Sequence, residues 1–109
     1  MEIISESLFK EKAFGKNTGK VVVQMSTSWC GPCKKMKVMM DSLSSTYTDI
    51  NLCYMDIGEC TQDFHNVFNI KSVPTTVFFE NGRILYTHTG VPASKEKLNE
   101  LITTTFQKG

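Results

Sequence analysis

Long apolar segments are missing from this 109-residue sequence, and so is any strong excess of charge of one sign. No stretch approaches the roughly 18 apolar residues that a membrane-spanning helix requires, so we expect no membrane association. Twelve basic and eleven acidic residues leave a net charge of +1. That balance gives no reason to expect nucleic acid or an anionic membrane surface as a partner.

The sequence also lacks the features of a secreted protein. Its first twelve residues, MEIISESLFKEK, are acidic from the second position and contain no long apolar run of the kind found in secretory leaders. We therefore expect a cytoplasmic protein. Four cysteines are too few for a small secreted scaffold held by disulfides. In a reducing compartment, a Cys-x-x-Cys pair serves catalysis or metal binding more often than structure.

The length suits one small domain, residues 1–109, and no repeat or linker divides it. Apolar runs predict strands at residues 2–4, 21–25 and 50–57, and Asn81-Gly82 predicts a hairpin between two further strands. Apolar residues at helical spacing predict helices between these strands and at the C-terminus. Strands that alternate with helices indicate an α/β fold with a central mixed sheet and helices on both faces.

The segment STSWCGPCKKMK, residues 26–37, contains two cysteines three positions apart. Three interpretations are open at this point: a metal knuckle, a structural disulfide and a redox centre. Zinc sites favour two close pairs of ligands, whereas the remaining cysteines, Cys53 and Cys60, are seven residues apart. The spacing therefore argues against a structural zinc site, and we expect no bound metal.

Chemistry at the start of a helix favours the redox interpretation. Cys30 is expected to open a helix, where unpaired backbone N–H groups and the positive end of the helix dipole favour a thiolate. Pro32 suits the first helical turn because its missing N–H costs nothing there. Cys33 lies over Cys30 on the same helical face, within disulfide range. We predict that Cys30 attacks a substrate disulfide and that Cys33 resolves the mixed disulfide.

The motif WCGPC after an apolar strand resembles the active site of the thioredoxin family. Residues 68–83, FNIKSVPTTVFFENGR, are similar to a second signature of that family, and the segment ending at Gly90 resembles its late glycine. This resemblance covers almost the whole chain and implies the thioredoxin fold. It also implies a cis bond at Val73-Pro74 and a shallow substrate-binding platform around an exposed Cys30 sulfur. The platform residues are Trp29, Gly31, Pro32, Val73, Pro74 and Gly90.

The resemblance further implies a protein-disulfide reductase that serves electron transport and cell redox homeostasis. Its partners are then disulfide-containing proteins and a thioredoxin reductase, which passes on electrons from NADPH. We expect a monomer without a bound cofactor, because two sulfurs carry the chemistry. Two alternatives stay open: an oxidant or isomerase on the same fold, and a redox-sensing binding module.

One position departs from the family pattern. Thioredoxins usually carry a buried aspartate six residues before the first cysteine, and this sequence has Gln24 there. A glutamine does not titrate, so it cannot act as a general base. We predict slower resolution by Cys33, not a loss of activity. Cys53 is expected to be a buried thiol and Cys60 a more exposed one, and a second, regulatory disulfide between them remains an alternative.

Overall fold

The computed structural model describes residues 1–107 as alternating strands and helices, and residues 108 and 109 of the expected domain lie outside this description. Ser5 caps the first helix by accepting a hydrogen bond from the backbone N–H of Leu8. The strands are β1 (Glu2–Ile3), β2 (Lys20–Ser26), β3 (Ile50–Asp56), β4 (Thr75–Glu80) and β5 (Arg83–Thr89). The helices are α1 (Glu6–Ala13), α2 (Gly31–Ser44), α3 (Gln62–Phe68) and α4 (Lys95–Gln107), with a short 3₁₀ helix at Ile57–Glu59.

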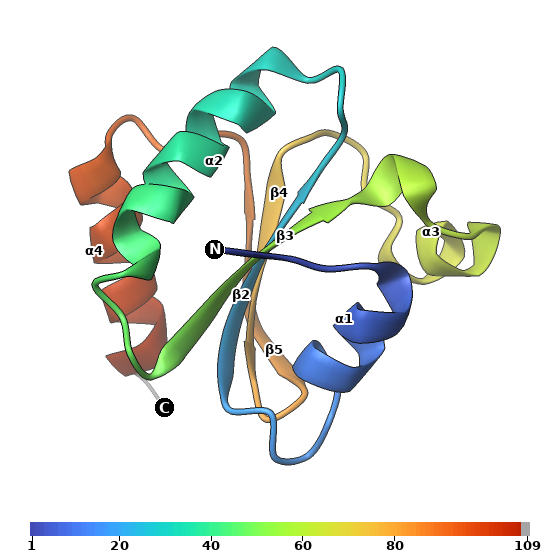
Figure 1. Cartoon of the computed structure of the whole chain (residues 1–109), viewed down its shortest axis with the longest axis horizontal. Helices are drawn as coiled ribbons and strands as arrows, with labels where there is room; N and C mark the ends of the chain where they lie inside the picture. The colour runs from blue at the N-terminus through green and yellow to red at the C-terminus, as the bar shows by residue number, and fades with distance from the viewer. Residues whose placement is uncertain (108–109) are drawn as a thin grey trace.

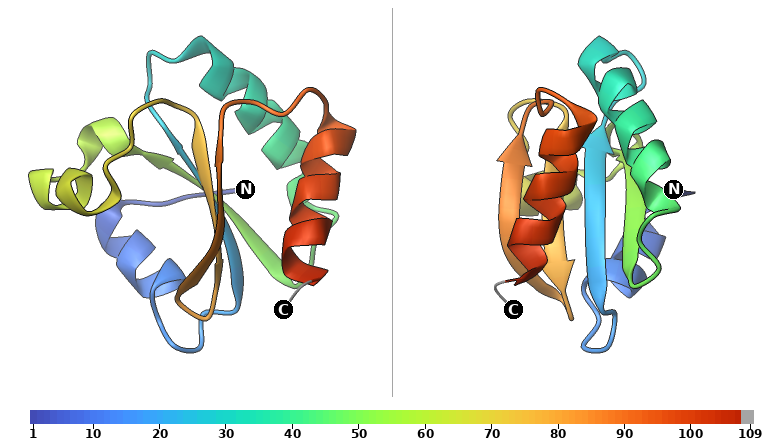
Figure 2. Two further views of the ribbon diagram at one scale, coloured as in Figure 1. Left: turned by 180° about the vertical axis from the view of Figure 1, so that it is seen from behind. Right: turned by 90° about the vertical axis from the view of Figure 1, so that its left-hand side faces the viewer.

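The five strands form one mixed sheet in the order β1-β3-β2-β4-β5. Strands β1, β3 and β2 are parallel, whereas β4 and β5 run antiparallel to their neighbours. Helices α1 and α3 cover one face of the sheet, and α2 and α4 cover the other (Figures 1 and 2). The predicted α/β architecture with helices on both faces is confirmed.

The predicted hairpin follows from its two central residues. Asn81 and Gly82 both have positive φ angles, +50° and +83°, which are the backbone conformations that a two-residue turn of this kind requires. The expected strand at 50–57 ends one residue earlier, because Ile57 enters the 3₁₀ helix. Asp56 caps that helix by accepting a hydrogen bond from the Gly58 N–H at 2.8 Å.

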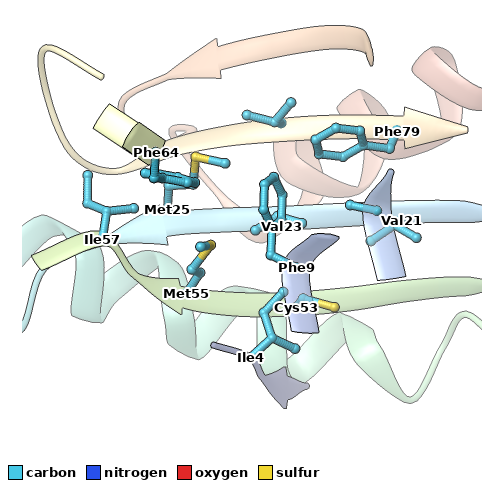
Figure 3. Close-up of a cluster of buried hydrophobic side chains, with 12 residues drawn as sticks. Ile4, Phe9, Val21, Val23, Met25, Cys53, Met55, Ile57, Phe64 and Phe79 are labelled. Atoms are coloured by element: carbon cyan, nitrogen blue, oxygen red, sulfur yellow. The ribbon is translucent and has the colours of Figure 1, made fainter. Parts of the chain in front are cut away.

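The core between the sheet and helices α1 and α3 is built around Phe9 (Figure 3). The Phe9 side chain is buried and makes edge-on contacts with four other rings, those of Phe14, Phe64, Phe68 and Phe79. Such edge-to-face pairs add to the free energy gained from burying apolar area. Phe9 therefore joins α1, α3 and β4 in one packed cluster.

The core between the sheet and helices α2 and α4 is apolar at one end and polar at the other. Val22 of β2 and Phe78 of β4 pair across the sheet beneath these helices. Because side chains alternate along a strand, Gln24 and Ser26 lie on the same face as Val22. Gln24 is paired with Thr76 of β4, and all three polar residues are fully buried. This face therefore becomes polar toward the end of β2, where the Cys-x-x-Cys segment follows.

Replacing Phe9 by alanine should lower the free energy of unfolding by about 3–5 kcal/mol, because it leaves a cavity among the surrounding rings. Urea denaturation of the oxidised protein measures this change. Val67→Ala on α3 is the matched control, since 75% of the Val67 side chain is exposed. We expect the control to change stability by no more than about 0.5 kcal/mol. A loss below about 1 kcal/mol for Phe9→Ala would contradict its central position in the cluster.

Candidate active site

Cys30 occupies the N-cap position of α2, one residue before the helix begins. Strand β2 ends at Ser26, and a three-residue turn connects it to Cys30. The Cys30 N–H donates a hydrogen bond to the Thr27 carbonyl oxygen at 3.3 Å. The Cys30 sulfur accepts a hydrogen bond from the Cys33 backbone N–H at 3.1 Å. A sulfur at this position uses one of the N–H groups left free by the first turn, and its negative form is stabilised there.

Cys30 and Cys33 are joined by a disulfide, with their α-carbons 5.3 Å apart. The two residues are unequally accessible: Cys33 is fully buried, whereas 8% of Cys30 is exposed. The sequence-based expectation of a freely exposed Cys30 sulfur is therefore only partly met. A contact with a second segment contributes to the difference, because the Val73 carbonyl oxygen lies 3.8 Å from this sulfur.

A second segment comes to the cysteine pair from between α3 and β4. The Val73-Pro74 peptide bond is cis, as the resemblance implied. The Val73 carbonyl oxygen lies 3.8 Å from the Cys30 sulfur. The Gly90 N–H donates a hydrogen bond to the Pro74 carbonyl oxygen at 2.9 Å, and Gly90 has a φ of +93°, a conformation that favours glycine. The structure thus brings Cys30, Val73, Pro74 and Gly90 together.

The remaining platform residues surround the start of α2. Gly31 and Pro32 form the first turn and are exposed. The Trp29 side chain is 76% exposed, and the edge of its ring lies against Gly58. A β-carbon at Gly58 would stand 3.2 Å from Trp29 Cη2 and 3.0 Å from Asp56 Oδ1. Sequence reasoning missed Gly58, because its contact with Trp29 joins the 3₁₀ helix to the turn before α2, and these segments are far apart in the chain.

Gln24 lies beside Cys33, inside the protein. Its side-chain Nε2 donates hydrogen bonds to the Cys33 carbonyl oxygen and to Ser26 Oγ, each at 2.9 Å. On the neighbouring strand β3, the residue in register with Gln24 is Tyr54. Gln24 itself does not ionise, so the position at which the family usually carries an aspartate holds a neutral side chain here.

Cys53 and Cys60 are free thiols outside this site. Burial raises the pKa of the Cys53 thiol to about 11, and the Glu2 carboxylate adds to the effect. Burial, followed by the carboxylates of Glu6, Asp56 and Glu59, raises the pKa of Cys60 to about 11 as well. Both groups are therefore protonated near neutral pH, and a thiol is much less nucleophilic than a thiolate.

The structure contains no disulfide between Cys53 and Cys60. Cys53 is fully buried, as expected, and Cys60 is more exposed. The Cys60 sulfur lies 3.8 Å from the carbonyl oxygen of Asp56, which is three residues, or about 10 Å, farther along β3 than Cys53. Within residues 1–107, no group of three or more His, Cys, Asp or Glu side chains is placed to hold a metal ion.

Comparisons with known proteins agree with this geometry. The sequence model of the family described as "Thioredoxin" matches residues 1–104. The chain is 36% identical to human thioredoxin over 105 residues, a match that covers 93% of this chain and 97% of the human protein. It is 37% identical to horse thioredoxin over 101 residues, with 93% of each chain covered.

Solved structures give the same result. The chain superimposes on the thioredoxin Mala s 13 of Malassezia sympodialis with a TM-score of 0.79 at 30% identity, covering 96% of this chain and 90% of that one. Plasmodium falciparum thioredoxin gives a TM-score of 0.78 at 28% identity, with coverages of 95% and 98%. No helix within the described part of the chain is long and apolar enough to cross a membrane.

The raised pKa of Cys53 predicts a loss of stability at alkaline pH. Between about pH 9 and pH 11 the unfolded chain releases the Cys53 proton while the folded protein keeps it. The free energy of unfolding should then fall by up to about 1.4 kcal/mol per pH unit from this group. Urea denaturation across this range should give a shallower decline for Cys53→Ala than for the unmodified protein. Equal slopes would contradict the assignment. Cys60→Ala should flatten the decline as well, because the pKa of Cys60 is also raised to about 11, and Val67→Ala, which removes no titrating group, is the control.

Proposed function

The chain belongs to the thioredoxin family and is a dithiol–disulfide oxidoreductase, and from this premise we propose that it is a protein-disulfide reductase for cell redox homeostasis. The observation that carries the proposal is the position of the Cys30 sulfur. It lies at the N-terminus of α2, 3.1 Å from the Cys33 N–H, and it is the more accessible of the two sulfurs. A sulfur in that position suits attack on a disulfide of another protein.

The proposed cycle has two exchange steps. The Cys30 thiolate attacks one sulfur of the substrate disulfide, which breaks that bond, forms a mixed disulfide and releases one substrate thiolate. The thiolate of Cys33 then attacks Cys30 of the mixed disulfide. The second substrate thiolate leaves, and the protein holds the Cys30–Cys33 disulfide described above. Two electrons pass to the substrate, which takes up two protons from solvent.

We propose that the substrate chain lies across the platform of Trp29, Gly31, Pro32, Val73, Pro74 and Gly90. The apolar ring of Trp29 supplies exposed contact area beside Cys30. The Val73 backbone, whose carbonyl oxygen is near the Cys30 sulfur, suits hydrogen bonds to an extended peptide. Backbone hydrogen bonds hold a peptide without selecting its side chains, which fits a reductase that serves several substrates.

Electrons must return to the Cys30–Cys33 disulfide after each cycle. We propose that a thioredoxin reductase supplies them from NADPH, so that the protein takes part in electron transport without a bound cofactor. We further propose that it acts in the cytoplasm as a monomer and that residues 1–109 form one domain. The near-balanced net charge of +1 is consistent with a protein that binds neither nucleic acid nor membranes.

A redox-sensing binding module is the second candidate function. The observation in its favour is Gln24, which contacts the Cys33 backbone where the family usually carries an aspartate and cannot accept a proton near neutral pH. Slow resolution by Cys33 would lengthen the lifetime of each mixed disulfide. The protein would then stay bound to its partner instead of turning over many disulfides. An oxidant or isomerase on the same fold is less well supported, because the Gly-Pro spacer matches the reducing members of the family.

A Cys33→Ser variant should accumulate mixed disulfides with protein substrates, because Cys30 can still attack and no thiol remains to resolve the product. Non-reducing electrophoresis and mass spectrometry of the adducts measure this, with insulin as a model substrate. We expect adducts at Cys30 and the loss of nearly all steady-state insulin reduction. The double variant Cys30→Ser/Cys33→Ser is the matched control and should form none.

Two results bear on the choice between the candidates. Catalytic turnover of insulin disulfides by the unmodified protein supports the reductase. If the unmodified protein gave no turnover and Cys33→Ser trapped no substrate through Cys30, both the reductase and the proposed cycle would be wrong. Stable trapping without turnover in the unmodified protein would instead favour the binding module.

A further inference from the structure

The side chain of Gln24 makes hydrogen bonds with only one of its two polar ends. Its Nε2 donates to the Cys33 carbonyl oxygen and to Ser26 Oγ, whereas its Oε1 is buried and has no hydrogen-bond partner among the described residues. A buried acceptor without a partner is costly, and such groups in native proteins call for an explanation. Gln24 is fully buried, so bulk water does not reach this atom.

The orientation of the Gln24 carboxamide is fixed by its neighbours. The Cys33 carbonyl oxygen can only accept a hydrogen bond, so the group that faces it must be the NH₂ and not the oxygen. Oε1 therefore stays free, on a carboxamide whose nitrogen is 2.9 Å from the backbone of Cys33. The free acceptor consequently lies close to Cys33, one of the two residues whose side chains change between the redox states.

The two redox states differ in what Cys33 can donate. In the disulfide, the Cys33 sulfur carries no hydrogen. Reduction breaks the S–S bond, and a dithiol reductant that becomes a disulfide supplies two electrons and two protons. One proton stays on the Cys33 sulfur, and the other passes to solvent when Cys30 is a thiolate. Cys33 then carries an S–H group, a weak hydrogen-bond donor, inside the protein. We propose that Gln24 Oε1 accepts this hydrogen bond, so that Gln24 is a positioning residue that selectively stabilises the reduced protein.

This proposal has a direct consequence for the redox equilibrium. A hydrogen bond that forms only in the reduced state favours that state, in the same way that a ligand shifts an equilibrium by its differential affinity. Gln24 therefore makes the protein a weaker reductant than the same fold with an apolar residue there. The inference rests on the proposed redox cycle of Cys30 and Cys33, because it concerns the equilibrium constant of that cycle.

A buried water molecule is a competing explanation for unpaired buried atoms, which within residues 1–107 include Thr27 Oγ1 as well as Gln24 Oε1. A buried water molecule that bridges polar atoms would satisfy Gln24 Oε1 equally in both redox states. The two explanations differ in one measurable respect. A bridging water adds the same stability to the oxidised and reduced proteins, whereas an S–H donor on Cys33 adds stability to the reduced protein alone.

The test is the equilibrium of the Cys30–Cys33 pair with reduced and oxidised glutathione, for the unmodified protein and for Gln24→Met. Methionine has a similar size and lacks both the acceptor and the amide donor. The fraction of oxidised protein is counted by alkylating free thiols and measuring mass. We expect the equilibrium constant for oxidation of the protein to rise about two- to tenfold in Gln24→Met, as loss of one modest hydrogen bond predicts.

Ser26→Ala is the matched control. It removes a partner of Gln24 Nε2 but leaves Oε1 and the Cys33 backbone contact in place. We expect it to lower the stability of both redox forms by similar amounts and to leave the equilibrium constant with glutathione unchanged. An equal shift in Ser26→Ala and Gln24→Met would assign the effect to general loosening of the site and overturn the proposal.

A measurement that retains Gln24 covers the case in which Gln24→Met does not fold. The infrared S–H stretching band of Cys33 is the difference between the spectra of Cys30→Ser and Cys30→Ser/Cys33→Ser. We expect the band at the lower frequency of a hydrogen-bonded thiol, and a band at the position of a free thiol overturns the proposal.

If the unmodified protein does not exchange with glutathione at all, the proposed redox cycle itself fails. Normal exchange with an unchanged constant in Gln24→Met defeats only the role of Gln24.

Discussion

The hydrogen bond from the Cys33 N–H to the Cys30 sulfur is the interaction on which the function of this structure depends. It forms because Cys30 is the N-cap of α2, and the first backbone N–H groups of a helix have no acceptor within the helix. Any shift in the start of the helix would direct that N–H elsewhere. The rest of the fold can therefore be understood by asking what fixes the beginning of α2.

Strand β2 supplies most of that constraint. It lies between β3 and β4 in the middle of the sheet, and both of its faces are buried beneath helices. Residues on one face, such as Val23, belong to the aromatic core around Phe9, so β2 cannot slide along its neighbours without disrupting that core. On the other face, Gln24 hydrogen-bonds to the Cys33 carbonyl oxygen and connects the strand directly to the first turn of α2. The apolar core thus fixes the strand, and the polar end of the second core fixes the helix to it.

The same arrangement gives the two cysteines different environments. Cys30 lies beside the Val73 carbonyl oxygen and keeps some access to solvent, whereas Cys33 is fully buried. Attack on a substrate requires access, and resolution requires only that the second sulfur be adjacent. Burial and neighbouring carboxylates raise the pKa of the remaining thiols, Cys53 and Cys60, to about 11, so that both are protonated near neutral pH. Reactivity among the four cysteines is therefore decided by their surroundings.

Features that depend on local sequence could be predicted. The Asn81-Gly82 hairpin and the helix that begins after Cys30 follow from residues adjacent in the chain, because turn and cap geometry are local. The cis bond before Pro74 came only from the family resemblance, since a cis X-Pro bond leaves no local signature that distinguishes it from trans. Contacts between distant segments could not be predicted, among them Gly58 against Trp29 and the limited exposure of Cys30. These depend on how whole elements pack, which no short motif specifies.

Partial alkylation of the fully reduced protein at neutral pH tests the central claim most directly. Limiting iodoacetamide is added, the reaction is stopped at successive times, and peptide mass spectrometry assigns the label to each of the four cysteines. Because the thiolate is the reactive form and Cys30 is the cysteine at the N-cap of a helix, the label should appear at Cys30 well before the other three. Comparable labelling rates at Cys30 and Cys33, or faster labelling of Cys33, would contradict the claim that the start of α2 activates Cys30.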